Sequence, residues 1–567
     1  MPITRTCCIS GKEFTITDED LAFYDKISPV IWGERFLIPP PTLCPEERLR
    51  RRLAWRNAYR DLCNIRFLSF LRRQESSPIM KSIFCFSSIS GFCRAPYNIY
   101  HSSCSIGNNP IVSMYSPDRW YLSVEQKIWW NDKVDNIQPS NQYNFSETFS
   151  SQFHTLIRKS FLACLSNEYL SNENSEYVNG TNNVKDCYLI FSASSGENCE
   201  YCEGLNNSNN CFDCYFTRNS ENCYECISLD RCYDCQYLEE SRDCRSCFNS
   251  YHLEWCHDCF LCINLTNQQY CIQNQEYPDE ASYREALGKF LDKTGAFKKE
   301  VRKQFDVIKQ SPWTIQKMIL SSENVIGNHI TNSHNVYEGY DINDTENSKY
   351  VQWLYGNVRD CYDCYSYGNG LERSYECGAN GGDSSDLISC YTVWKNSHKV
   401  YYSFFCYQCE DCFGCVGLKN KQYCVFNKQY SKEEYTIVVR KIIDNMIRDG
   451  EWGEFFSPQI SPFGYNETMA NLYFPLEKEK AIKLGYQWND YEPPRPEAEK
   501  YIPASRLPEN IEEIPDDILS WAIECEESGK YYKITKPELE FYRKHHLPIP
   551  RKHYDMRRKE RFERRFR

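Results

Sequence analysis

Long apolar runs are missing from this 567-residue sequence, and so is an excess of basic residues. No stretch approaches the roughly 20 consecutive apolar residues that a membrane-spanning helix needs. The formal net charge of −12 argues against a protein that coats nucleic acid without specificity. The N-terminal residues also lack the apolar segment of a secretory signal peptide, because Glu13, Asp18 and Glu19 occupy its place. We therefore expect a cytoplasmic protein that does not enter a membrane.

The motifs of common enzyme classes are missing as well. The sequence has no phosphate-binding loop, no dinucleotide-binding fingerprint and no recognisable arrangement of Ser, His and Asp. Its 10 histidines are scattered, and none has the His-x-x-x-His spacing of a hydrolytic metal site. These absences favour a protein that is not an enzyme.

Cysteine, in contrast, is abundant, with 33 residues in the chain. From Cys187 to Cys271 every gap between neighbouring cysteines is a multiple of three, and twelve is the commonest repeat. The repeated unit has Asn or Asp before a Cys-x-x-Cys pair, as at Asn198 and Asn210. A fixed period of this kind is typical of a stacked repeat structure.

Twelve residues are too few for a pair of helices but enough for one coil of a narrow β-solenoid. Stacked coils would lie about 4.8 Å apart, as neighbouring strands do. Cysteine suits the interior of such a coil, because larger apolar side chains would overfill it. Asn, Asp, Ser and Gly between the pairs tolerate the backbone conformations of tight corners. The sequence therefore predicts coils with inward cysteines and outward Tyr and Phe.

A second block repeats the pattern with one more residue per coil, which we expect to extend one turn. The residues that are each thirteen apart are Ser348, Cys361, Ser374, Leu387 and Val400. The two blocks end in the same Gln-Tyr-Cys sequence, at Cys271 and Cys424. The predicted fold is therefore mixed and β-rich, with two narrow cysteine-lined β-solenoids, helical spacers and a small ribbon-plus-helix module at each end.

The cysteine pairs leave free thiols, metal ligands and disulfides open as alternatives. Two Cys-x-x-Cys pairs can make a zinc site, whereas uniform repetition in a cytoplasmic protein favours a ladder of thiols. The second block contains a Cys-x-x-Cys run like those that bind iron–sulfur clusters, but without the longer final gap and the proline of the ferredoxin pattern. The candidate metal ligands are Cys199, Cys202, Cys211, Cys214, Cys223, Cys226, Cys232, Cys235, Cys406, Cys409, Cys412 and Cys415. We expect no required cofactor, and zinc is the metal of the alternative.

The two ends of the chain share one pattern. The residues Cys7, Gly11, Thr17, Phe23 and Tyr24 have counterparts at the same offsets in Cys525, Gly529, Thr535, Phe541 and Tyr542. The pattern predicts a turn between two strands and a short helix that begins after Thr17 or Thr535. This module resembles a zinc-ribbon domain, and the resemblance implies four metal ligands per copy. The ligands that remain are Cys7 and Cys44 at one end and Cys525 and His553 at the other, whereas Ser10, Glu47, Ser528 and Met556 stand at the other positions.

The whole chain resembles a family of uncharacterised cysteine-rich repeat proteins from small-genome bacteria. The resemblance rests on the repeats, on the two ends and on short sequences that include Trp129-Trp130 and Trp452-Gly453. It implies this architecture and no particular activity.

Arginines cluster between Arg48 and Arg60 and again between Arg551 and Arg567. These basic stretches are either solvated, or paired with acidic segments of the same chain, or a site for RNA or another polyanion. The acidic balance of the whole chain favours the first two.

We expect eight segments in the chain. They are a ribbon module with a basic helix (1–62), an insertion with little order (63–103), a strand and helix module (104–165), solenoid I (166–275), a helical spacer (276–334), solenoid II (335–430), a helix with a Pro-rich strap (431–515) and a ribbon module with a basic tail (516–567). The predicted function is a cytoplasmic scaffold or binding protein with an unknown protein partner. The alternatives are a zinc or iron–sulfur protein that uses the cysteine pairs, and an RNA-binding protein that uses the terminal helices.

Overall fold

The computed structural model describes residues 2–31, 33–57, 98–119, 121–131, 134–291, 295–309 and 319–565. Contacts group these residues into two units. Unit 1 contains the described residues up to 166 and residues 319–491, whereas unit 2 contains residues 167–309 and 492–565. Each unit therefore combines one cysteine-rich block with one end of the chain.

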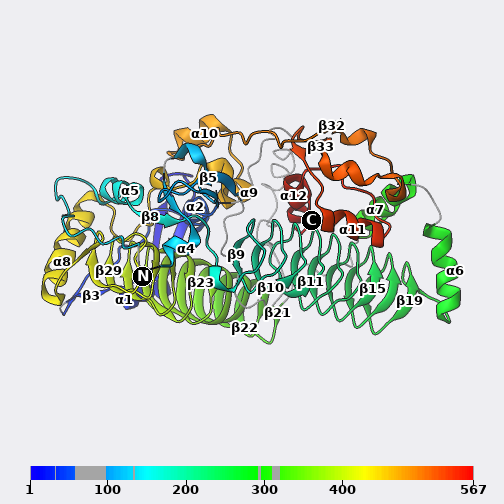
Figure 1. Ribbon diagram of the computed structural model, residues 1–567. Coiled ribbons are helices and arrows are strands. Elements are labelled where there is room, and N and C mark those ends of the chain that lie inside the picture. Colours follow the sequence, from blue (N-terminus) through cyan, green and yellow to red (C-terminus); the bar gives the residue numbers. More distant parts are fainter. Residues whose placement is uncertain are drawn as a thin grey trace. The chain divides into compact units, whose positions relative to one another are not determined.

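Solenoid I, in unit 2, is a stack of short parallel strands (Figure 1). Neighbouring strands pair with an offset of twelve residues, as Ile227 does with Tyr215 and Cys259 with Cys247. The strands are β9 (Asn179–Asn182), β10 (Phe191–Glu197), β11 (Asn206–Asn209), β12 (Tyr215–Arg218), β13 (Ile227–Asp230), β14 (Glu239–Arg242), β15 (Arg245–Phe248), β16 (Tyr251–Glu254), β17 (His257–Phe260), β18 (Ile263–Thr266) and β19 (Gln269–Ile272). The predicted solenoid with a twelve-residue coil is confirmed.

The coil turns at every third residue. From Asn183 to Gln273 each third residue has a positive φ near 50°, apart from Gly204 at 70°. Asn and Asp fill many of these positions, as expected, but so do Phe216 and Trp255. A left-handed residue with a Cβ costs roughly 1 kcal/mol, so hydrogen bonds between coils must offset a repeated cost. The expectation that Asn, Asp, Ser and Gly make the corners was therefore too narrow.

The residue after each left-handed position lies inside the solenoid. These positions form the buried core, and one column of it is cysteine in every coil. The column consists of Cys187, Cys199, Cys211, Cys223, Cys235, Cys247, Cys259 and Cys271. None of these side chains is more than 4% exposed. The prediction of inward cysteines is confirmed, but Ile190, Leu205 and Leu229 also fill inward positions, so the interior is not limited to small side chains.

Solenoid II, in unit 1, has the same construction (Figure 1). Its strands are β21 (Ile319–Leu320), β22 (Glu323–Thr331), β23 (His334–Gly368), β24 (Leu371–Gly381), β25 (Ser384–Ile388), β26 (Tyr391–Trp394), β27 (His398–Tyr401), β28 (Phe404–Tyr407), β29 (Glu410–Phe413) and β30 (Gln422–Val425). Strands from β23 to β28 pair with an offset of thirteen, as in Cys377 opposite Cys364. Two consecutive left-handed residues hold the added residue, for example Gly382 and Asp383. Pairing starts at Ile319, before the predicted start at residue 335, because the first coils use Val and Ile inside instead of cysteine.

Both solenoids end in the same way. A short antiparallel strand closes each last coil, namely β20 (Gln275–Glu276) on β19 and β31 (Lys428–Gln429) on β30. In unit 2, helices α6 (Glu280–Leu291) and α7 (Gly295–Lys309) follow within the predicted helical spacer, and the residues between them lie outside the described part. In unit 1, α8 (Lys432–Asp449) follows, in the segment predicted to hold a helix and a strap. It begins with a capping box at Ser431 and ends at Gly450.

The ends of the chain form the two expected ribbon-plus-helix modules. The N-terminal module contains β1 (Ile3–Thr6), β2 (Glu13–Ile16), α1 (Asp18–Ile27) and α2 (Pro45–Leu53). The C-terminal module contains β33 (Trp521–Glu524), β34 (Tyr531–Tyr532), α11 (Lys536–Lys544) and α12 (Tyr554–Arg565). In both, a glycine with a positive φ closes the turn, and its N–H donates to the carbonyl of Cys7 or Cys525. Thr17 and Thr535 cap α1 and α11, as predicted.

The remaining elements of unit 1 lie between these parts in the sequence. They are β5 (Tyr100–Ser103), β6 (Pro110–Ser113), β7 (Leu122–Val124), α4 (Gln126–Trp129), α5 (Phe149–Lys159), β8 (Phe161–Ala163), α9 (Met469–Tyr473) and α10 (Lys478–Lys483). The expected helix from Phe149 to Leu165 ends at Lys159, where the chain turns into β8. Residues 63–97 of the predicted insertion (63–103) lie outside the described residues. Its last residues are described, and there β5 pairs with β6, so the fold resumes before the predicted boundary. No helix within the described ranges has the length and apolar composition to cross a membrane.

Candidate functional site

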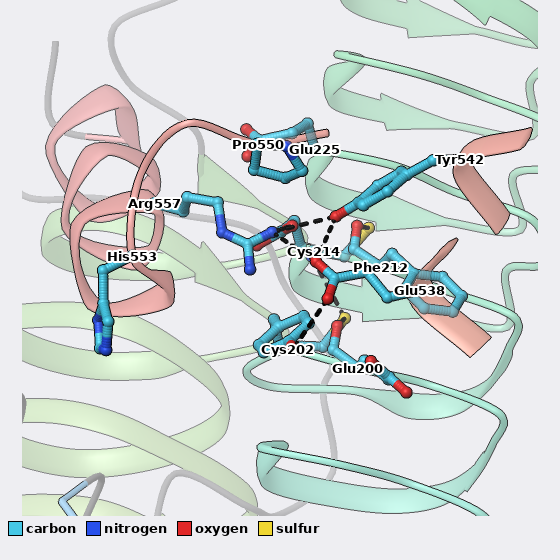
Figure 2. A network of polar contacts seen from close by, with 12 residues as sticks. Glu200, Cys202, Phe212, Cys214, Glu225, Glu538, Tyr542, Pro550, His553 and Arg557 are labelled. Carbon is cyan, nitrogen blue, oxygen red and sulfur yellow. Dashed lines mark hydrogen bonds and ion pairs between the residues drawn. The ribbon is translucent and has the colours of Figure 1, made fainter. Parts of the chain in front are cut away.

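A pair of arginines joins the C-terminal module to solenoid I. Arg557 and Arg561, one helical turn apart on α12, both bind the carboxylate of Asp213, with Arg561 Nη1 2.6 Å from Oδ1. Arg561 Nη1 also lies 3.1 Å from Glu225 Oε1 in the next coil. The side chains of Arg561 and Asp213 are at most 1% exposed. Figure 2 shows Arg557 directed from α12 toward Glu538 and Tyr542 of α11.

The N-terminal module repeats this arrangement on solenoid II. Arg48 and Arg52, one turn apart on α2, bind Asp363, with Nε of Arg48 2.9 Å from Oδ2 and Nη2 of Arg52 3.0 Å from Oδ1. Arg52 Nη1 also donates to Glu376 in the next coil at 2.7 Å. Asp363 and Glu376 have no exposed side-chain surface. We call each set of two arginines and two carboxylates an arginine clamp.

The clamps can form because the rise of one helical turn is close to the spacing between successive coils. Residues four apart on a helix are separated by about 6 Å along its axis, and successive coils by about 4.8 Å. Two arginines on consecutive turns can therefore reach carboxylates on consecutive coils, thirteen residues apart in solenoid II and twelve in solenoid I. Removing one member of such a buried set leaves an uncompensated charge, which costs about 3–5 kcal/mol.

Stacked aromatic rings accompany each clamp. Phe541 of α11 stacks on Phe212 with centroids 4.2 Å apart, and Phe23 of α1 stacks on Tyr362 at 3.7 Å. Phe212 and Tyr362 follow equivalent inward cysteines, Cys211 and Cys361. These two outward rings are thus covered by the modules.

The two units differ in the solenoid residue that contacts the start of α1 or α11. In unit 1 the ammonium of Lys349 lies 2.7 Å from Asp20 Oδ1, at the start of α1. In unit 2 Glu200 occupies the place of Lys349 and accepts a hydrogen bond of 2.7 Å from the hydroxyl of Thr535, the residue that caps α11. Burial, together with the nearby carboxylate of Glu538, raises the pKa of Glu200 to about 8.

Most of the arginines named in the two basic stretches form ion pairs within their own unit. Besides the clamp residues, Arg51 binds Glu376 and Glu454, and Arg564 binds Glu225 and Glu239. Arg551 pairs with Glu509 and Glu526, whereas Arg60 and Arg567 lie outside the described residues. The favoured reading, an internal partner for the arginines, is what the contacts support, and binding of RNA or another polyanion stays a prediction.

The candidate metal ligands of the repeats are thiols directed to the backbone. Cys199 Sγ lies 3.2 Å from the carbonyl of Glu197 and 3.4 Å from that of Ser208, and the N–H of Cys211 points at the same sulfur. Serines in other coils make equivalent contacts, as Ser220 does through its hydroxyl. Burial raises the pKa of Cys199 well above the usual value, whereas at Cys214 burial is outweighed by hydrogen bonds from Cys202 and neighbouring thiols, which lower the pKa. A buried, protonated thiol such as that of Cys199 is inert.

All twelve candidates share this buried setting. The positions are Cys199, Cys202, Cys211, Cys214, Cys223, Cys226, Cys232 and Cys235 in solenoid I and Cys406, Cys409, Cys412 and Cys415 in solenoid II. Within the described part of the chain every cysteine is a free thiol, and only Cys8 is exposed. Also within that part, no group of three or more His, Cys, Asp or Glu side chains is arranged to hold a metal ion.

The ribbon ends hold half of a zinc site each. Cys7 and Cys44 are buried together, with Ser10 Oγ 3.6 Å from Cys44 Sγ. At the other end Cys525 accepts the N–H of Ser528, and His553 Nδ1 accepts the N–H of Asp555 at 3.2 Å. Tetrahedral zinc takes four such ligands, so these residues do not fit it, and zinc binding here stays a prediction.

A polar face of solenoid I carries regular ladders of side chains. Residues twelve apart pair across coils, as in Arg218 with Asp230, Arg231 with Asp243 and Asn207 with Asn219. Trp255 and Tyr233 are 55% and 44% exposed beside these ladders. Exposed ion pairs contribute at most about 1 kcal/mol each, so the ladders define a surface more than they stabilise the coil.

Comparison with known proteins does not assign this chain to a family. No family model matches the chain, and no curated protein matches it. One similar solved structure is described as an acetyltransferase from Desulfovibrio desulfuricans, with 10% identity and a TM-score of 0.10 over 43% of this chain and 65% of that chain. This chain thus spans less than two thirds of that protein, and a TM-score this low carries no argument about fold or function.

The arginine clamps were not predicted as sites. Arg48 and Asp363 are 315 residues apart, so no local pattern connects them. A signal was nevertheless present in both halves of the sequence. Arginines recur four apart at each end, and an acidic residue follows two positions after cysteine or serine in consecutive coils, as at Asp363 and Glu376.

Proposed function

We propose that this protein is a non-enzymatic scaffold that presents two solenoid faces to protein partners, and that it works in the cytoplasm. One observation carries the proposal: the groups capable of chemistry are used within each unit to hold coils and modules together. The inward thiols of the coils donate to backbone carbonyls, and the arginines and carboxylates of the clamps bind one another. A cytoplasmic setting keeps such thiols reduced.

The state of the thiols tests this proposal against the metal or redox alternative. Purified protein is analysed for zinc and iron, and cysteines are mapped by mass spectrometry after brief labelling with an alkylating reagent. We expect less than one metal ion per chain, and among the described cysteines rapid labelling of Cys8 alone. Several zinc or iron ions per chain, lost in Cys223→Ser, would instead favour the metal protein.

The polar face of solenoid I is the surface on which we expect a partner. A photo-crosslinking amino acid is placed at Trp255 or Tyr233, and the control places it at Ile482 of unit 1, which is 53% exposed. The proposal expects one shared crosslinked product from both positions on solenoid I and none from the control. Absence of crosslinks at both solenoid positions in cells would contradict it.

A further inference from the structure

Two buried carboxyl groups meet where α11 docks on solenoid I. Glu200 is 4% exposed, and Glu538 is fully buried. Thr535 joins them, because its hydroxyl donates to Glu200 Oε2 at 2.7 Å and its N–H to Glu538 Oε2 at 3.3 Å. Two carboxylates this close in a buried site cannot both ionise without strong repulsion.

The surrounding groups do not supply enough positive charge. From solenoid I, the hydroxyl of Tyr201 donates to Glu538 at 3.0 Å, and from α11 the hydroxyl of Tyr542 donates at 2.7 Å. From α12, Arg557 lies 3.4 Å from Glu538, but it is shared with Asp213. Arg561, the next arginine of α12, is bound to Asp213 and Glu225. Asp213 thus binds both arginines, and the guanidinium of Arg557 reaches Glu538 only at 3.4 Å.

The equivalent place in unit 1 carries an ion pair instead. There the ammonium of Lys349 binds Asp20 at the start of α1. Lys349 and Asp20 are both buried, so opposite charges there compensate each other.

We propose that Glu200, packed against the docked Glu538, forms a proton-operated latch, which holds the C-terminal module on solenoid I while Glu200 carries a proton and loosens it when Glu200 is ionised. The latch goes beyond the scaffold function, since it controls whether α11 and α12 cover this part of solenoid I.

The direction of the effect follows from the pKa of Glu200. Burial and the charge of Glu538 raise this pKa to about 8 from the usual 4.5. A carboxyl whose pKa is higher in the docked state favours docking at low pH, and this contribution is lost as the pH rises toward the docked value. The pKa of Asp213 is raised by burial to about 6, and burial lowers those of His545 and, to about 4, His553. Of the four groups with shifted pKa values named here, Glu200 is thus the one whose pKa lies above pH 6.5.

Hydrogen exchange of the full chain measures the latch. Opening of the α11 amides, corrected for the intrinsic rate, should increase about tenfold per pH unit between pH 6.5 and pH 8. The amides of α1 in unit 1 are the internal control and should change little. Glu200→Gln should remove the dependence in α11, and Glu200→Lys should do the same by recreating the pair of unit 1.

The reverse variant gives an independent measurement. Lys349→Glu places a carboxyl opposite Asp20 and should transfer the pH dependence to α1. If α11 and α1 of the unaltered protein respond alike to pH, or if the response of α11 survives in Glu200→Gln, the latch is wrong. The comparison within the unaltered chain decides the matter even if a variant does not fold.

Discussion

The two units place the same kinds of side chains at the same positions of their clamps, yet they differ in the residue that meets the docking helix. Arg48, Arg52 and Asp363 in unit 1 correspond to Arg557, Arg561 and Asp213 in unit 2. Lys349, in contrast, corresponds to Glu200. The match between the helical and coil spacings thus determines where the clamp residues stand. The residue at the edge of the interface is not constrained in this way, and its charge differs between the two units.

Removing the carboxylate that the two arginines of a clamp share should have the largest effect. Asp363→Ala and Asp213→Ala each remove the carboxylate that two buried arginines share, so each should lower the free energy of unfolding of its unit by about 5 kcal/mol. Denaturant unfolding followed by hydrogen exchange assigns the loss to one unit. Glu285→Gln, in a fully exposed pair on α6, is the control and should leave stability unchanged. A loss below about 1 kcal/mol at both positions would mean that the clamps contribute little.

Removing the stacked rings should have the second largest effect. Phe23→Ala and Phe541→Ala remove nearly buried rings that stack on Tyr362 and Phe212. Each should cost about 3–4 kcal/mol, measured as a shift of the unfolding midpoint. Similar losses in the two units would support equivalent docking, and a loss in only one would show that the other module is held by its arginines alone.

Acid should weaken unit 2 through His553, for which unit 1 has Cys44 instead. Burial lowers the pKa of His553 to about 4, so its neutral form stabilises unit 2 above the unfolded value of 6.5. This contribution falls as the pH drops from about 6.5 to 4 and amounts to about 3 kcal/mol. His553→Gln should flatten this part of the stability curve of unit 2, measured by denaturant titrations at several pH values. An unchanged curve would exclude His553 as its source.

The smallest effect is expected inside the coils. Cys211→Ser in solenoid I and Cys361→Ser in solenoid II should each cost about 1 kcal/mol, because serines already occupy inward positions, including Ser374 beside Cys361. Equal small losses fit a ladder of thiols and hydroxyls in both units. A large loss in solenoid I alone, reversed by added zinc, would indicate a metal role there.

The sequence was sufficient for the coils but not for what covers them. Spacing of cysteine located the inward positions, because a coil has one period along its whole length. The left-handed conformation of Tyr201 or Phe216 was not foreseeable, since neither residue prefers it and only the stacked coils impose it. The clamps were also missed, because their arginines and carboxylates come from segments more than 300 residues apart.

Stacking also gives the solenoids a mechanical character. Hydrogen bonds between coils run along the axis, so a pull on the two ends of a solenoid loads them directly. Each coil stores about 4 nm of extended chain within about 0.5 nm of axial length. A solenoid under tension should therefore lengthen in nearly equal steps, one coil at a time, with the coils under the clamped modules yielding last.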